Sequence, residues 1–136
     1  MLKIGKYDIS DKNKPFIIAE ISANHKNNLN HLLKMIDGAA EAGVAAVKIQ
    51  TILPNEITLN CSDPDFIIKN RQSKWFGKKY FDIYTEAAIP LDWHHKVLNR
   101  AKENNIIAFS SPFDEKSVEF LNNLNVPCFK IASFEN

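Results

Sequence analysis

The sequence predicts an α/β protein whose parallel strands are covered by helices. Three observations support this class: apolar runs typical of buried strands alternate with segments of helical spacing, no linker or low-complexity tract interrupts them, and the apolar runs end in polar residues. Strict alternation of strands and helices favours parallel strands joined by right-handed crossovers. A doubly wound sheet and a (β/α)8 barrel both fit this order.

Four apolar runs are the predicted strands. The first, "KPFIIAEIS", is a compact apolar run after a proline and has the composition of a strand buried on both faces, so we expect it to be central in the sheet. The other runs, "VAAVKIQ", "IIAFSS" and "CFKIAS", are rich in small, branched or aromatic residues. The four predicted strands span residues 14–22, 44–50, 106–111 and 128–133.

Three amphipathic segments are the predicted helices, and they cover residues 28–42, 92–104 and 114–124. Each begins with a side chain that can accept a hydrogen bond from the first helical turn. These predicted N-caps are Asn28, Asp92 and Asp114. Gly43 suits the position just beyond the end of the first helix. The inward stripe of the last helix is predicted to be Val118, Leu121 and Leu124.

The composition narrows the function classes. The 136 residues are 45% hydrophobic and 24% charged with a formal net charge of +1, which is ordinary for one globular domain. The sequence shows neither an apolar run long enough for a membrane span nor a signal peptide, so we expect a cytoplasmic protein. The lack of a basic cluster with an aromatic platform disfavours nucleic-acid binding. Cys61 and Cys128 are expected to be reduced thiols, with Cys128 packed in a core.

Polar residues gather where the predicted strands end. In both candidate architectures, ligands bind at the carboxyl ends of the strands. The residues at these ends are Glu20, Asn24, Lys48, Gln50, Ser110, Ser111, Lys130, Ser133 and Glu135. Lys48 and Gln50 are two positions apart and therefore point to the same face. A buried lysine needs an acidic partner or an anionic ligand, and Glu20 or Glu135 are candidates for the partner.

Four motifs carry a resemblance to a known family. The segments "AEISANH", "KIQT", "FSSPFD" and "FKIASFE", in this order and at these spacings, resemble the N-terminal half of the sialic acid synthase family, and most closely its pseudaminic acid synthase branch. Two positions depart from the commoner family pattern: Phe134 stands where a small residue is typical, which implies a differently shaped sugar pocket, and Ser111 replaces threonine. The start "LKIGKYDIS" is similar to the hairpin that plugs the bottom of the family's barrel.

The resemblance implies the N-terminal half of a (β/α)8 TIM barrel with a leading β-hairpin. Residues 1–13 are then the hairpin and residues 14–136 the first four strands with their helices, whereas a complete barrel needs about 250 residues. The C-terminal half-barrel and the family's antifreeze-like domain are expected to be absent from this chain. The implied complete enzyme is a homodimer that condenses phosphoenolpyruvate with an amino-sugar aldehyde.

The resemblance also implies roles for the strand-end residues. Phosphoenolpyruvate carries a phosphate and a carboxylate, which need several hydrogen-bond donors from different strands. The expected substrate-binding residues are Asn24, Lys48, Gln50, Ser111, Lys130 and Ser133. Glu20 and Glu135 are the candidate acid and base, because water must be activated and an alkoxide protonated. Pairing with the lysines is the alternative role of these glutamates.

The resemblance implies a divalent cofactor, manganese or magnesium, whose histidine ligands lie outside this chain. His94 and His95 are adjacent on a predicted helix and cannot chelate one ion, and His25 lies in a loop at the first strand end. The segment 52–91 is expected to be an active-site loop followed by an extra helix, in which Trp75 and Phe76 either serve the site or anchor the core.

Two other functions fit the residues. Lys48 or Lys130 at a barrel strand end suits a Schiff-base aldolase. A non-catalytic half-barrel that pairs with another copy or a partner through its exposed sheet edges is the second alternative.

Overall fold

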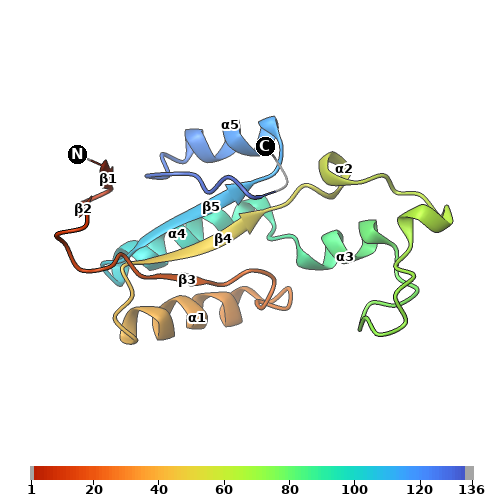
Figure 1. Cartoon of the computed structure of the whole chain (residues 1–136). Coiled ribbons are helices and arrows are strands. Elements are labelled where there is room, and N and C mark those ends of the chain that lie inside the picture. Colours follow the sequence, from red (N-terminus) through yellow and green to blue (C-terminus); the bar gives the residue numbers. More distant parts are fainter. Residues whose placement is uncertain (1, 134–136) are drawn as a thin grey trace.

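A computed structural model describes residues 2–133 of the chain. Figure 1 shows a small sheet flanked by helices, a hairpin at one end and a long excursion at the other. The sheet contains β3 (Ile18–Glu20), β4 (Ala46–Thr51) and β5 (Ile107–Pro112). These strands are parallel in the order β3-β4-β5. This α/β arrangement, with helices between parallel strands, confirms the predicted fold class, the N-terminal half of a (β/α)8 barrel.

The leading hairpin pairs β1 (Leu2–Ile4) with β2 (Tyr7–Ile9) in antiparallel register. Gly5 in its turn has a φ of +55°, and a Cβ added there would lie 2.8 Å from the Ile107 side chain at the start of β5. A glycine thus lets the hairpin approach the sheet closely. Lys6 secures this contact by donating hydrogen bonds to the backbone carbonyl and side-chain oxygen of Asn105.

Helix α1 (Leu29–Glu41) has the predicted start and end. The Asn28 side chain accepts a hydrogen bond from the backbone N–H of His31 at 2.9 Å, as an N-cap does. Gly43 follows the helix with a φ of +81°, the left-handed conformation that glycine adopts most easily. Leu32 and Ile36 are fully buried on the face of α1 that packs against the sheet.

The two later helices confirm one predicted cap and correct the other. In α5 (Glu115–Asn123), Asp114 accepts from the Ser117 N–H at 2.8 Å, as predicted. Helix α4 (His94–Glu103) instead follows a 3₁₀ turn, η2 (Leu91–Trp93), so the prediction that Asp92 caps it was wrong. The turn draws Asp92 into a helical segment before α4 begins, and α4 starts without a side-chain cap.

The inward stripe predicted for α5 is correct only in part. Leu121 is buried, whereas Leu124 is half-buried and Val118 is 42% exposed. Ser117 is the other buried residue of this helix, and its hydroxyl donates a hydrogen bond to Asp114 at 2.6 Å. The helix therefore presents a narrower apolar face than the sequence pattern indicates.

Two strand predictions need correction. Strand β3 has three residues and lies at the edge of the described sheet, so the prediction of a central strand over 14–22 was wrong, and Ile18 is 39% exposed. The predicted strand at 128–133 is reduced to one parallel bridge between Ser110 and Phe129. Both outcomes have the same cause, since each segment has a strand partner on only one side within the described residues.

The excursion over residues 52–91 contains α2 (Pro54–Ile57), η1 (Pro64–Phe66) and α3 (Tyr80–Ala87). Figure 1 shows it projecting from the end of β4, opposite the hairpin. It is held together by local bonds, among them an antiparallel bridge between Ile67 and Lys79. Trp75 and Phe76 are 40% and 53% exposed, so neither anchors the core.

The core lies between the sheet and its helices. It combines side chains from α1, β4 and α4, including Leu32, Ile36, Val47, Ile49, Val97 and Ala101. Because side chains alternate along a strand, Val47, Ile49 and Thr51 belong to the face of β4 that packs on the helices, which we call the outer face. Lys48 and Gln50 belong to the opposite face, here called the inner face. Cys128 is half-buried and lies outside this core, contrary to the prediction.

Candidate active site

The inner face of the sheet brings together four of the predicted site residues. Parallel pairing places Glu20 beside Lys48 and Gln50 beside Ser111. The Lys48 ammonium lies 3.2 Å from a Glu20 carboxylate oxygen and donates to the Ser111 hydroxyl at 3.3 Å. Lys48 and Ser111 are 5% and 2% exposed, whereas the Glu20 side chain is 60% exposed.

Of the two glutamates expected as partners of Lys48, Glu20 is in contact with it. A lysine that is almost fully buried keeps its charge at low cost only when such a partner or an anionic ligand is present. Because Glu20 is largely open to solvent, its carboxylate can leave the lysine for water when a ligand anion approaches. The cluster of Lys48, Glu20 and Ser111 thus offers a cation and a hydroxyl donor that a phosphate or carboxylate can use.

Gln50 extends this cluster toward the loop after β3. Its amide oxygen accepts a hydrogen bond from the Ser22 hydroxyl at 3.0 Å. Ser22 has a φ of +51°, which is uncommon for a residue with a side chain and costs roughly 1–3 kcal/mol. The strained backbone thus accompanies the hydrogen bond from Ser22 to Gln50.

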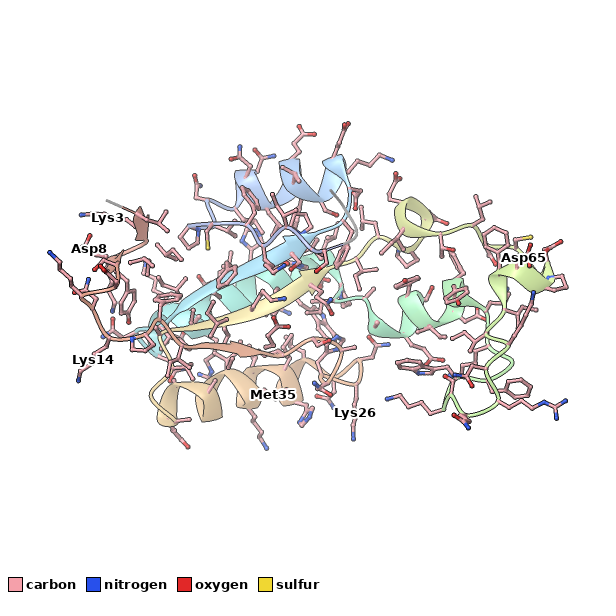
Figure 2. All side chains as sticks on the ribbon, viewed as in Figure 1. Lys3, Asp8, Lys14, Lys26, Met35 and Asp65 are labelled. Carbon is pink, nitrogen blue, oxygen red and sulfur yellow. The ribbon has the colours of Figure 1, made fainter. Side chains whose placement is uncertain are left out.

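A pocket of about 520 Å³ adjoins this end of β3 and is bounded by the loop after β3 and by the excursion. Its walls include Ser22, Asn24, Lys26, Asn27, Lys74, Trp75, Ile83 and Glu86. Asn24 is exposed, and its amide donates to the Ile21 carbonyl at 3.0 Å. Lys74 lies over the Trp75 ring, 4.5 Å from its centroid. In Figure 2, Lys26 lies at the end of α1 nearer the excursion, whereas Lys14 lies at the hairpin end.

Two of the predicted residues, Lys130 and Ser133, lie outside the inner-face cluster. Lys130 is exposed, and its ammonium bonds to the carbonyl of Ile131. Its backbone N–H, however, donates to the Ser110 carbonyl at 3.1 Å, which places the segment beside the end of β5. Ser133 is exposed. Glu135, the second candidate acid or base, lies outside the described residues.

The His25 ring connects two segments of the chain through hydrogen bonds to backbone groups. It is fully buried, Nδ1 accepts from the backbone N–H of Asn27 at 3.1 Å, and Nε2 therefore donates to the Ala87 carbonyl at 3.2 Å. Burial lowers the pKa of His25, partly opposed by the Ala87 carbonyl and reinforced by His31, so the ring is neutral at pH 7. His25 thus ties the loop after β3 to the end of α3, which are two walls of the pocket.

Sequence reasoning missed Ser22 and left the roles of His25 and Trp75 open. These three residues gain their positions from the loop conformation and from the approach of the excursion, and neither follows from local periodicity. The adjacent histidines His94 and His95 face different directions on a helix, which indicates different surroundings for the two rings. His94 is buried and His95 is exposed.

Within residues 2–133, no three histidine, cysteine, aspartate or glutamate side chains converge as ion ligands. Among the same residues, no helix combines the length and apolar character that a bilayer span requires.

The fold and the inner-face cluster define an α/β protein of the TIM-barrel class with a polar site at its strand ends, and comparisons identify the family. The NeuB family model matches residues 35–136. Pseudaminic acid synthase of Campylobacter jejuni is 44% identical over 134 residues, which cover 98% of this chain and 38% of the relative. Pseudaminic acid synthase of Helicobacter pylori is 39% identical over 121 residues, covering 89% and 35%.

Two solved structures are also similar to this chain. N-acetylneuraminic acid synthetase of Leptospira borgpetersenii, in complex with citrate, superposes with a TM-score of 0.76 at 29% identity, covering 97% of this chain and 41% of that one. The spore coat polysaccharide biosynthesis protein SpsE of Bacillus subtilis gives 0.74 at 30% identity, covering 98% and 34%. The chain belongs to the NeuB family. It spans less than half the length of these relatives.

Proposed function

We propose that this chain supplies one wall of the active site of a nonulosonic acid synthase, which condenses phosphoenolpyruvate with a six-carbon amino-sugar aldehyde. The observation that carries the proposal is the buried Lys48 held between Glu20 and Ser111 at parallel strand ends. The names of the relatives support the class, and the identity to two pseudaminic acid synthases favours a product of the pseudaminic type. We further propose a cytoplasmic homodimer as the complete enzyme.

The proposed reaction forms one carbon–carbon bond. The methylene carbon of phosphoenolpyruvate attacks the aldehyde carbon, water adds to the cationic carbon that results, and the bond from this carbon to the bridging oxygen breaks as phosphate leaves. One proton is removed from the water and another is delivered to the aldehyde oxygen. Glu20 and Glu135 are the proposed proton carriers, since a carboxyl pair can divide these two tasks.

The remaining predicted residues are proposed to bind the substrates. Lys48 and Ser111 hold the phosphoenolpyruvate anion, because a buried cation and a hydroxyl are close enough to bind one oxyanion together. Lys130 and Ser133 join them from the segment beside β5. Gln50 presents its amide nitrogen to the same anion or to the sugar.

The pocket beside β3 is the proposed sugar site. It offers amide groups from Asn24 and Asn27 together with the apolar surface of Trp75, a combination that suits a sugar carrying hydroxyls and acetamido groups. The pocket opens beside Ser22, which bonds to Gln50, so an aldehyde bound there lies next to the anion site.

A divalent metal remains part of the expectation that the family resemblance raises. The residues described here form no ion site, and both ring nitrogens of His25 are engaged by backbone groups. No step is therefore assigned to a metal.

A labelling experiment on the full-length protein tests the proposal. Phosphoenolpyruvate with a heavy oxygen isotope in its bridging position is supplied with an amino-sugar aldehyde and manganese. Cleavage of the C–O bond places the label in the released phosphate, and release depends on the aldehyde. A covalent adduct trapped by borohydride at Lys48 or Lys130, without phosphate release, would instead establish the aldolase alternative.

A substitution separates the proton carriers from the binding residues. Glu135→Gln keeps the size and hydrogen bonding of the side chain but cannot exchange a proton. We expect kcat to fall while KM for phosphoenolpyruvate stays close to that of the unmodified protein. An unchanged kcat removes Glu135 from the reaction.

A further inference from the structure

A buried polar cluster lies on the outer face of the sheet, directly behind the inner-face site. It consists of Thr51 at the end of β4, Ser110 in β5 and His94 in the first turn of α4. Their exposed fractions are 0%, 1% and 1%. None of the three has a role in the proposed reaction, yet each is a polar group withdrawn from water, which is costly unless its bonds are satisfied.

The hydrogen bonds of the cluster have one consistent direction. His94 Nδ1 lies 3.3 Å from the Pro90 carbonyl, which can only accept, so the proton sits on Nδ1. Nε2 then accepts from the Thr51 hydroxyl at 2.9 Å, and the Thr51 oxygen accepts from the Ser110 hydroxyl at 2.7 Å. Burial lowers the pKa of His94, opposed by the Pro90 and Leu91 backbone and by Asp92 and reinforced by His95, which keeps this ring neutral.

The cluster is joined to the residues that form the inner-face site. Thr51 follows Gln50 in β4, and Ser110 precedes Ser111 in β5, so each outer-face hydroxyl is one peptide away from an inner-face side chain. Ser111 in turn holds the Lys48 ammonium. The Ser110 carbonyl also accepts from the Lys130 N–H. One buried cluster thus connects the ends of β4 and β5 to the segment that carries Lys130.

We infer that His94 is a positioning residue of the synthase: through Thr51 and Ser110 it fixes how the carboxyl ends of β4 and β5 lie relative to each other, and thereby the placement of Lys48, Gln50 and Ser111. The inference rests on the proposed function for its activity readout only. The geometry favours positioning over plain packing because an apolar side chain fills the same space without setting the direction of the two hydroxyls. The edge-on Phe120 ring, with its centroid 5.1 Å from that of His94, covers the cluster from α5.

The test compares three variants of the full-length protein. His94→Leu removes both ring nitrogens and keeps an apolar side chain, His94→Gln restores an acceptor for Thr51, and His95→Leu is the matched control on the exposed neighbour. Misplacing reacting groups slightly can cost up to about 100-fold in rate, so we expect kcat to fall about 10- to 100-fold in His94→Leu. His94→Gln should recover most of this loss, and His95→Leu should match the unmodified protein.

A second pair of variants serves if His94→Leu does not fold. Thr51→Val removes the linking hydroxyl at nearly constant shape, whereas Thr51→Ser retains it. We expect kcat to fall in Thr51→Val and to persist in Thr51→Ser. A kcat per folded molecule that is equal in these two variants overturns the inference, as does an unaltered kcat in His94→Leu.

A readout without turnover separates this inference from the proposed function. Amide hydrogen exchange at Gln50, Ser111 and Lys130 reports whether the strand ends are held, whatever the protein catalyses. We expect faster exchange at these amides in His94→Leu, with protection in α1 unchanged. If the unmodified protein proves inactive as a synthase but exchange accelerates as stated, the proposed function fails and the positioning role stands. Unchanged exchange at the strand ends refutes the positioning role.

Discussion

The two faces of the β4–β5 pair carry similar polar side chains in opposite settings. On the outer face, the Thr51 hydroxyl bonds to both Ser110 and His94, so the hydrogen bonds of this cluster are satisfied within the protein. On the inner face, the partners of Lys48 among residues 2–133 are the exposed Glu20 and the hydroxyl of Ser111. A polar group satisfied internally stabilises the fold, whereas one held by an exposed partner remains free to bind a ligand.

The comparison separates two adjacent serines that composition cannot distinguish. Ser110 and Ser111 have the same chemistry and nearly the same burial. Their pairing differs, because Ser110 lies opposite Ile49 and Ser111 opposite Gln50. The face that a residue occupies therefore decides whether its hydroxyl serves the core or the site.

Substitution of a core residue that packs behind the outer face should cause the largest loss of stability and leave the inner-face site intact. Leu32 of α1 is fully buried in the core. Leu32→Ala removes buried methyl groups and leaves a cavity, so we expect the free energy of unfolding to fall by about 2–5 kcal/mol. Denaturant unfolding of the full-length protein measures this change. KM for phosphoenolpyruvate in the folded fraction should stay constant, and a raised KM would show that the two faces are coupled.

Substitution of the inner-face lysine, Lys48, should have the opposite effect, because it should impair the site rather than the fold. Lys48→Met keeps an apolar stem of similar length and removes the charge. A charge-assisted contact contributes roughly 1.5–3 kcal/mol, so kcat/KM for phosphoenolpyruvate should fall roughly 10- to 150-fold. Steady-state kinetics measure this loss. Lys34→Met, at an exposed position on α1, is the control. An unaltered kcat/KM in Lys48→Met excludes Lys48 from the anion site.

Substitutions of Ser110 and Ser111 should have smaller effects, which differ between the two faces. Ser110→Ala removes a hydroxyl with protein partners, and we expect it to lower the free energy of unfolding by about 0.5–1.5 kcal/mol. Ser111→Ala should change stability less and raise KM for phosphoenolpyruvate. Chemical denaturation and kinetics on both variants give the result. Equal behaviour of the two serines contradicts the assignment of separate roles to the two faces.

The alternation of strands and helices could be predicted because it depends on local patterns. Asn28 and Asp114 cap their helices as expected, since a cap needs only the neighbouring backbone. The need of Lys48 for an acidic partner followed from strand-end placement and the cost of an unpaired buried charge, with Glu20 and Glu135 as the candidates. The helix caps need no knowledge of distant contacts, whereas the choice of Glu20 depends on the parallel pairing of β3 with β4.

One misplaced feature, the Asp92 cap, has a local cause, because a 3₁₀ turn directly precedes α4. The other misplaced features depend on tertiary context. Strand β3 is exposed because it is an edge strand in the described sheet, which its apolar composition does not reveal. Ser22 reaches Gln50 only through a left-handed backbone conformation. The cluster around His94 joins residues 43 and 59 positions apart in the sequence, as the bonds of Thr51 to His94 and Ser110 show. Periodicity cannot detect such pairings.

Mildly acidic pH should lower the free energy of unfolding gradually, and this effect depends on the two buried histidines. Burial lowers the pKa of both His25 and His94 below about 6.5, the ordinary value for histidine in an unfolded chain. As pH falls through 6.5, the unfolded chain therefore binds protons before the folded one, and the free energy of unfolding decreases. Their contribution is fully present above about pH 6.5 and is lost toward the lower folded pKa values.

Thermal unfolding between neutral and mildly acidic pH measures this effect. The slope of stability against pH should flatten in His94→Gln, because the titrating ring on the outer face is gone while the acceptor for Thr51 remains. His95→Gln is the control, since that side chain is exposed and the same substitution should leave the slope unchanged. If the slope in His94→Gln equals that of the unmodified protein, His94 takes up no proton on unfolding. The claim that the His94 ring is neutral in the folded protein, on which the direction of the outer-face hydrogen bonds depends, would then lack support.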